Sequence, residues 1–255
     1  MGSSTVVEAA RRALGPVGAS LPVPTTSAPS IGLQRDAVRR LERAGYRAAW
    51  TNETIGKDAL VQLAVLMAAT ERMTFGTCVA NIWARPAQTT HGAAALLAQA
   101  YPGRFVLGLG VGYPEQAASV GREFGRPLAT MRDYLDQMGA PPQLPAPDVA
   151  YPRIIGANGP KMLALASEIT DGAMPAMQPP EFTAQARQVL GPDKLLVIFM
   201  RASTEPGDSS AITATVREHV AAGADHVIAG LPIGTDFTVG VDQLEQLAPA
   251  LVEVP

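Results

Sequence analysis

Residues 156–162 combine residue types that suit the binding of a negatively charged ligand. An apolar strand pattern over residues 153–157 ends here, and Pro160 fits the first turn of the helix that follows. The free backbone N–H groups of that turn, the positive end of the helix dipole and Lys161 would together attract a phosphate or a carboxylate. An ordinary helix start with a solvated lysine accounts for the same residues, so the physical chemistry leaves both interpretations open.

Residues 104–112 form an apolar strand pattern that runs into glycines spaced by two. Glycine has no Cβ and permits positive φ, so a flat ligand or another part of the backbone can come close. A dinucleotide-binding turn would need these glycines to open a helix at once, whereas the next strong helical pattern begins near Pro127. We therefore expect a close approach at this strand, but no dinucleotide pyrophosphate.

Composition favours one domain over residues 1–255, because 47% of the 255 residues are hydrophobic and can bury a barrel-sized core. The net charge of -3, with no long run of either sign, gives no indication of a nucleic-acid or membrane partner. We expect residues 1–14 to form a short helical extension on the surface rather than a secretory signal.

Cysteine and histidine usage limits the possible location and chemistry. The lone Cys78 cannot form an internal disulfide, which is typical of a reducing, cytoplasmic compartment. The three histidines lie far apart without ligand-like spacing, so we expect no metal site.

Strand-like and helical patterns alternate from about residue 15 to the end of the chain. Eight strand–helix pairs predict a single-domain (β/α)₈ barrel with a parallel inner sheet, and an open doubly wound sheet is the alternative. Barrels of this kind carry their chemistry at the C-terminal ends of the strands. Those ends include Asn52 and Glu53 after the second strand, Asn81 after the third and Gly110 after the fourth. The strand patterns cover residues 17–21, 48–51, 73–82, 104–112, 153–157, 172–177, 194–201 and 224–230.

Four segments, residues 41–53, 75–81, 103–112 and 158–163, resemble the bacterial luciferase-like family in their order and spacing. The chain is most similar to the branch of that family that uses the deazaflavin coenzyme F420. The resemblance implies a (β/α)₈ luciferase-like barrel that binds coenzyme F420, or alternatively FMN, at its C-terminal mouth. It also implies a homodimer.

Carried over residue by residue, the resemblance implies a non-proline cis peptide at Cys78-Val79 behind the central ring of the cofactor. It directs Asn81 toward the ring edge. The residues placed near the rest of the cofactor are Gly110, Val111 and Gly112 at the ring, and Asn158, Gly159, Pro160, Lys161 and Met162 at the phosphate.

The implied chemistry is hydride transfer between the deazaflavin and an unidentified small organic substrate, with Glu53 and Asn52 as the candidate catalytic residues. In relatives that oxidise alcohols a histidine follows the acid, but Thr54 stands here and a hydroxyl is a poor general base. This departure argues against an alcohol dehydrogenase and leaves the proton donor unassigned. The alternatives are an FMN-dependent monooxygenase, a non-catalytic cofactor-binding homologue and an unrelated barrel enzyme that handles a phosphorylated metabolite.

Overall fold

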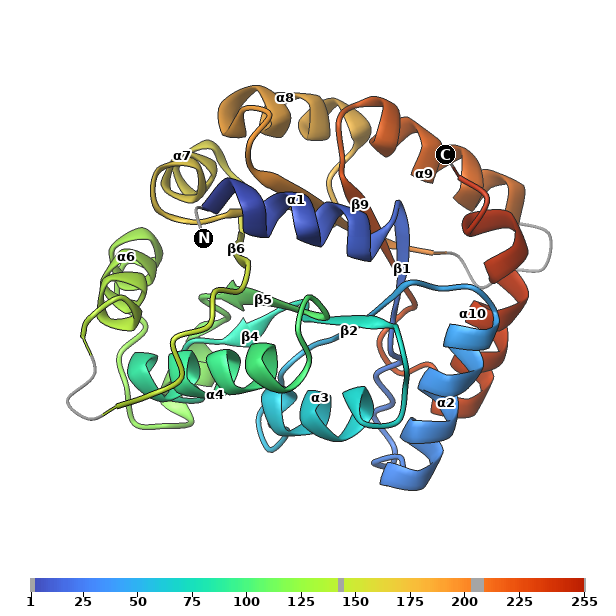
Figure 1. The fold of residues 1–255 in the computed structure, drawn as a ribbon, viewed down its shortest axis with the longest axis horizontal. Helices are drawn as coiled ribbons and strands as arrows, with labels where there is room; N and C mark the ends of the chain where they lie inside the picture. Colours follow the sequence, from blue (N-terminus) through green and yellow to red (C-terminus); the bar gives the residue numbers. More distant parts are fainter. Residues whose placement is uncertain (1–2, 142–144, 203–208, 255) are drawn as a thin grey trace.

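The computed structural model describes residues 3–141, 145–202 and 209–254, which form a closed parallel β-barrel surrounded by helices (Figure 1). The strands follow the order β3, β2, β1, β9, β8, β7, β6, β5, and β3 pairs with β5 to close the ring. The short β4 continues the path of β3 and also pairs with β5, so within the described residues nine strands fill eight positions. The predicted (β/α)₈ barrel is confirmed. The strands are β1 (Val17–Ser20), β2 (Ala48–Thr51), β3 (Thr74–Thr77), β4 (Ala80–Asn81), β5 (Phe105–Gly110), β6 (Arg153–Gly156), β7 (Gly172–Met174), β8 (Leu195–Arg201) and β9 (His226–Gly230).

The helices form an outer layer because each buries one apolar face against the barrel. Each barrel helix contacts the next around the ring, from α2 through α3, α4, α6, α7, α8 and α9 to α10, which returns to α2. None of the helices that the structure describes is long and apolar enough to cross a membrane. The helices are α1 (Ser3–Leu14), α2 (Ile31–Arg43), α3 (Ala59–Met67), α4 (Ala87–Ala100), α5 (Pro114–Ala118), α6 (Pro127–Met138), α7 (Pro160–Ile169), α8 (Pro180–Leu190), α9 (Ser209–Ala221) and α10 (Phe237–Leu251).

Helix α1 closes the N-terminal end of the barrel and is not the surface extension that the sequence suggested. It lies across the barrel in Figure 1, and its Val7, Ala10 and Leu14 are buried among residues of the barrel interior. Arg11 ties it to the N-terminal ends of the strands through Asp225 (Nε to Oδ1, 3.0 Å) and the carbonyl of Lys194 (2.7 Å). Glu8 and Arg12 are exposed, and the charged side chains made the sequence look like that of a surface helix.

Helix α5 is a second departure from the sequence-based expectation, which placed no strong helical pattern between the glycines of residues 108–112 and Pro127. It spans only Pro114–Ala118, too short for a periodic apolar pattern. The backbone N–H of Tyr113 donates to Oε1 of Gln116 (2.9 Å), so the protein itself occupies a donor that a pyrophosphate would need. A helix does follow the glycines of β5, but this contact gives no support to a dinucleotide site.

His226, inside the barrel near α1, is held in one neutral form. Its Nδ1 lies 2.6 Å from the carbonyl oxygen of Gly15, and its Nε2 accepts a hydrogen bond from Nε1 of Trp50 (2.9 Å). A carbonyl only accepts, so the proton resides on Nδ1. Burial lowers the pKa of His226 from 6.5 to about 4.

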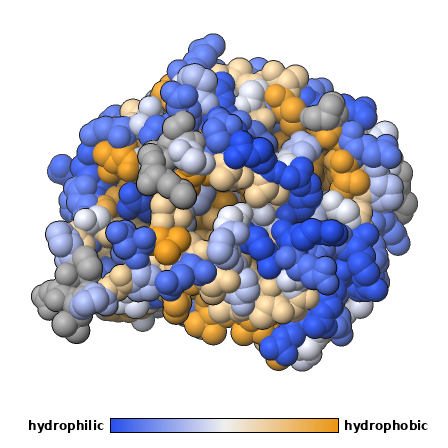
Figure 2. All heavy atoms as spheres, viewed as in Figure 1, coloured by the Kyte–Doolittle hydropathy of each residue, from blue (hydrophilic) through white to orange (hydrophobic). Residues whose placement is uncertain are grey.

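The surface in the same view carries its polar residues mainly over α2 and α10 (Figure 2). There the Arg40 guanidinium pairs with Asp242 (2.7 Å) and with Glu245. These ion pairs join α2 to α10, the contact that completes the helical ring between the start and the end of the chain.

Candidate active site at the barrel mouth

The third barrel strand is interrupted at the mouth by a bulge. Between β3 and β4 the peptide bond Cys78-Val79 is cis, as the resemblance predicted. The bulge is held by the neighbouring strand, because the N–H of Cys78 donates to the Thr51 carbonyl (2.8 Å) and the Val79 carbonyl accepts from the N–H of Glu53 (3.1 Å).

Glycines of β5 and β6 give this bulge its space. A Cβ at Gly110 would lie 2.2 Å from Cγ2 of Val79, and one at Gly156 would lie 3.9 Å from its Cγ1. At Gly108 the close neighbour is backbone, since a Cβ there would lie 2.1 Å from the Thr77 carbonyl oxygen. The glycine-rich strand therefore admits the protein's own bulge, which is the close backbone approach that the sequence predicted.

The Gly108→Ala variant is expected to lower the free energy of unfolding by about 1–3 kcal/mol, because the Thr77 carbonyl belongs to the ladder and cannot move aside freely. Thr77 also clamps Gly108 through its hydroxyl, which donates to the Gly108 carbonyl (2.6 Å) and accepts from its N–H (2.9 Å). Urea denaturation provides the measurement. The matched control is Gly92→Ala in α4, where a Cβ meets nothing within 4 Å, and a gain of up to about 1 kcal/mol is expected. Equal stability of the Gly108→Ala and wild-type proteins would contradict the packing argument.

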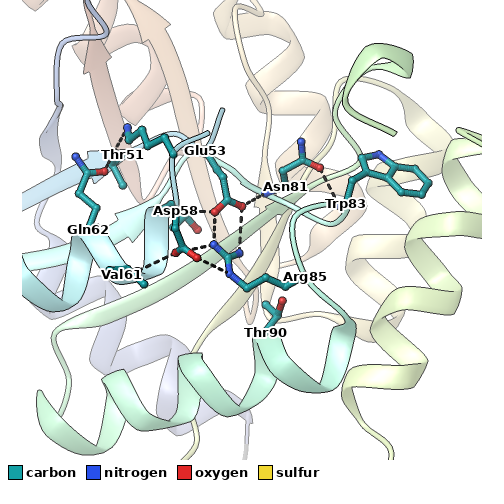
Figure 3. Close-up of polar contacts among 12 residues, drawn as sticks. Thr51, Glu53, Asp58, Val61, Gln62, Asn81, Trp83, Arg85 and Thr90 are labelled. Carbon is teal, nitrogen blue, oxygen red and sulfur yellow. Dashed lines mark hydrogen bonds and ion pairs between the residues drawn. The ribbon is translucent and has the colours of Figure 1, made fainter. Parts of the chain in front are cut away.

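Glu53 is a buried structural acid in this geometry. Its side chain is 1% exposed, and its carboxylate accepts from the N–H groups of Ala59 (2.9 Å) and Asn81 (2.8 Å). Both its oxygens also pair with the Arg85 guanidinium, which bonds to Asp58 as well (Figure 3). Four donors occupy the lone pairs of the carboxylate. Through them Glu53 connects the start of α3, strand β4 and Arg85. This arrangement offers no support for the catalytic role that the resemblance implied.

Asn52, the other candidate catalytic residue, lies at the end of β2 and accepts a hydrogen bond from Nζ of Lys57 through Oδ1 (3.2 Å). Lys57 also donates to Oγ1 of Thr51 (2.8 Å). Burial lowers the pKa of Lys57, and the nearby Cys78 and Glu53 offset part of that effect. Sequence reasoning missed Lys57, because it lies in a loop with no motif or periodic spacing to mark it.

Asn81 and Trp83 form the wall of a pocket beside the bulge. Oδ1 of Asn81 accepts from the N–H of Trp83 (2.9 Å; Figure 3), and Nε1 of Trp83 donates to the Val111 carbonyl (2.8 Å). Gly112 adopts a φ of 62° there, which a residue with a side chain rarely does. The pocket has a volume of about 370 Å³ and reaches from the loop after β2 to α5. The structure therefore brings together Asn52, Glu53, Asn81 and the bulge.

The predicted anion cradle lies at the start of α7. Gly159 is the N-cap, Pro160 occupies the first turn, and Lys161 is exposed. A Cβ on Gly159 would meet nothing within 4 Å, so the space beside the helix start is open. Oδ1 of Asn158 accepts from the N–H of Ala176 (2.7 Å), which fastens the loop to the segment after β7. Met162 is partly buried and packs against the core.

Fold and mouth together define a class of protein. It is a (β/α)₈ barrel whose third strand carries a cis bulge beside a polar pocket, at the end where barrel enzymes place their chemistry. Residues 17–190 match the model of the luciferase-like monooxygenase family. The chain belongs to this family, and the resemblance seen in the sequence is confirmed.

A protein of Mycobacterium tuberculosis, named as a coenzyme F420-dependent oxidoreductase, is 30% identical to this chain over 187 residues. The match covers 61% of this chain and 54% of that protein, and the chain spans about half the length of the curated relatives it matches.

Solved structures share the whole barrel. An F420-dependent secondary alcohol dehydrogenase in complex with an F420–acetone adduct superposes with a TM-score of 0.71 at 15% identity, covering 92% of this chain and 98% of that one. An FMN-bound type II Baeyer–Villiger monooxygenase of Pseudomonas putida superposes with a TM-score of 0.68 at 11% identity, covering 92% of this chain and 97% of that one. At these identities both likenesses concern the fold alone.

Proposed function

We propose that this protein is a coenzyme F420-dependent oxidoreductase that transfers a hydride between the deazaflavin and a small organic substrate. The observation that carries the proposal is the cis peptide Cys78-Val79, seated against Gly110 at the mouth of a barrel of this family. The relative named as an F420-dependent oxidoreductase supports the choice of cofactor. A homodimer remains part of the proposal.

The residues at the mouth fit a long, flat cofactor with a phosphate-bearing tail. The ring would lie against the bulge, with Asn81 and Val111 beside it, since Asn81 lines the pocket and the Val111 carbonyl accepts a hydrogen bond from Trp83 in the pocket wall. The phosphate would lie at the start of α7, where the open face of Gly159 and the exposed Lys161 leave room for it.

The protein's own contribution is placement, electrostatics and the exclusion of water. The bound deazaflavin would supply the chemistry of hydride transfer. The Glu53–Arg85 pair fixes the loop after β2 and the path of β4, so that Asn81 and the bulge keep one geometry. Trp83 and Asn81 would shield one side of the pocket from solvent.

Parallel fluorescence titrations of the purified protein with coenzyme F420 and with FMN test the cofactor. We expect quenching that saturates at lower concentrations of F420 than of FMN. Tighter binding of FMN would overturn the proposal in favour of an FMN-dependent monooxygenase. Binding of neither would favour a non-catalytic homologue that holds some other ligand.

The Lys161→Ala variant is expected to bind F420 about tenfold more weakly, which corresponds to the loss of one charge-assisted contact worth about 1.4 kcal/mol. The same titration measures it. Lys194→Ala is the matched control, because Nζ of Lys194 bonds to the Thr170 carbonyl, away from the mouth. An unchanged affinity in Lys161→Ala would exclude the side chain from the phosphate site, although the backbone cradle could remain.

A further inference from the structure

Lys57 holds an ammonium group at the barrel mouth, and among the residues that the structure describes no carboxylate forms an ion pair with it. Its Nζ donates to Oγ1 of Thr51 (2.8 Å) and to Oδ1 of Asn52 (3.2 Å), both at the end of β2. Within the described part of the chain no salt bridge includes Lys57, since the nearby Glu53 and Asp58 are both paired with Arg85. Lys57 is only partly exposed, and a charge withdrawn from water in this way needs a reason in the fold or in the function.

A directed chain of hydrogen bonds holds this ammonium from behind. The Thr51 hydroxyl donates to Oε1 of Gln62 (2.7 Å), Nε2 of Gln62 donates to Oε1 of Gln34 (2.6 Å), and Nε2 of Gln34 donates to the Pro29 carbonyl (2.9 Å). Every donor in the chain points away from Lys57, so each bond polarises the next acceptor toward the cation. Side chains from β2, α3 and α2 thus cooperate to hold one ammonium in place.

The Lys57 ammonium has a third N–H group beside the pocket that its two acceptors, Thr51 and Asn52, do not use. An ammonium carries three N–H groups, and the two acceptors at the end of β2 take two of them. Lys57 lines the cavity of about 370 Å³ together with Asn81 and Trp83. The third N–H is therefore available to a ligand there.

The other titratable groups around Lys57 are unsuited to give a proton at neutral pH. Glu53, Asp58 and Arg85 form one ion-paired cluster, whose carboxylates are acceptors and whose guanidinium keeps its protons. Burial raises the pKa of the Cys78 thiol to about 11. Burial acts in the opposite direction on Lys57, whose lowered pKa makes its ammonium a better acid.

We propose that Lys57 donates the proton that completes reduction of the substrate, and that the substrate is a conjugated carbonyl compound or an imine. This inference rests on the proposed function. In a conjugated carbonyl compound the hydride from the reduced deazaflavin forms a C–H bond at the β-carbon, and the displaced π electrons move toward the carbonyl oxygen. An N–H bond of Lys57 breaks, its proton passes to the substrate, and the resulting amine regains a proton from water. The deazaflavin is oxidised by two electrons and the substrate is reduced by two.

The substrate class follows from the charge that develops. Hydride addition to a conjugated carbonyl or to an imine places negative charge on oxygen or nitrogen, where a nearby ammonium stabilises it. An isolated alkene develops its charge on carbon and gains little from Lys57. We therefore expect no reduction of isolated alkenes.

The chemical test uses reduced coenzyme F420 with two probes, cyclohex-2-en-1-one and 1-pyrroline. Lys57→Met is expected to lower kcat about 100-fold, the usual size of a general-acid contribution, with the affinity for F420 changed less than about twofold. Lys57→Arg is not expected to restore kcat, because its guanidinium keeps the charge but does not release a proton. Wild-type kcat is expected to fall as the pH rises through the pKa of Lys57, since only the ammonium form donates.

A labelling experiment supplies a readout besides activity. The chain has three lysines, Lys57, Lys161 and Lys194, so trace acetylation with acetic anhydride across a pH series can be followed for each by mass spectrometry. The midpoint for Lys57 is expected below the usual lysine value of about 10.4 and equal to the midpoint of the alkaline limb of kcat. Gln62→Leu, which removes the acceptor behind Thr51, is expected to lower that midpoint further and to shift the limb with it.

The possible outcomes distinguish failure of the proton-donor proposal from failure of the proposed function. The role of Lys57 as proton donor is overturned if Lys57→Met or Lys57→Arg keeps the wild-type kcat. It is also overturned if the alkaline fall of kcat does not follow the Lys57 labelling midpoint. In both cases the cofactor proposal stands. Tight F420 binding without reduction of either probe overturns the substrate class. Absence of F420 binding by the wild type overturns the proposed function and the proton donor with it.

Discussion

Replacing Arg85 with methionine is expected to lower the free energy of unfolding by about 3–5 kcal/mol, because it leaves a buried carboxylate without its partner. Glu53 is 1% exposed and Arg85 11%, so water cannot replace the lost guanidinium without opening the loop after β2. Asp58, which caps α3, loses the same partner. Guanidinium chloride denaturation monitored by circular dichroism measures the loss.

Two further variants show whether the cost comes from the uncompensated charge. The double variant Glu53→Gln/Arg85→Met is expected to recover part of the lost stability, since the buried negative charge is gone. Arg132→Met breaks an exposed pair with Glu168 and is expected to change stability little. If Arg85→Met is as stable as Arg132→Met, the buried pair is not what holds the mouth together.

Acidification is expected to destabilise the fold through His226. The unfolded chain binds this proton near pH 6.5 and the folded protein only near pH 4, so the unfolded state holds more protons between these values. The free energy of unfolding should therefore fall as the pH is lowered from about 6.5 to about 4, by about 3 kcal/mol for a shift of this size. The physical cause is burial, with a second N–H at Nε2 also directed against the indole N–H of Trp50.

The measurement is urea denaturation of the wild type and of His226→Gln at several pH values. His226→Gln is expected to be less stable at neutral pH but to lose less stability between pH 6.5 and pH 4. His91→Gln is the control, because His91 is only partly buried and should change the slope less. Parallel curves for the wild type and His226→Gln would show that the titration resides elsewhere.

The barrel could be predicted from the sequence because its strands are buried on both faces and alternate with amphipathic helices. The observed strand boundaries differ from the predicted ones where local packing determines them. Residues 73–82 read as one strand but divide into β3 and β4 at the bulge, which leaves no trace in an apolar pattern. Only the family resemblance located the cis bond at Cys78-Val79.

The candidate site was predictable in position but less so in the roles of its residues. Asn52, Glu53 and Asn81 do meet at the mouth, since parallel strands bring their C-terminal ends together. The involvement of Glu53 with Arg85 depends on residues 32 positions apart, and the sequence gives no measure of that distance in space. Lys57 depends on glutamines from two different helices, so no local pattern could reveal it.

Helix α1, which closes the N-terminal end of the barrel, also bears on the kinetics of ligand binding. Val7, Ala10 and Leu14 pack against the buried interior residues Trp50 and Ile228, so the barrel core is filled and a ligand can reach the protein only at the mouth. A flat cofactor seated against the bulge would lie beneath whatever substrate covers it, so the two cannot exchange independently. We therefore expect compulsory-order kinetics, in which the cofactor enters first and leaves last, and a tightly bound substrate analogue slows its departure.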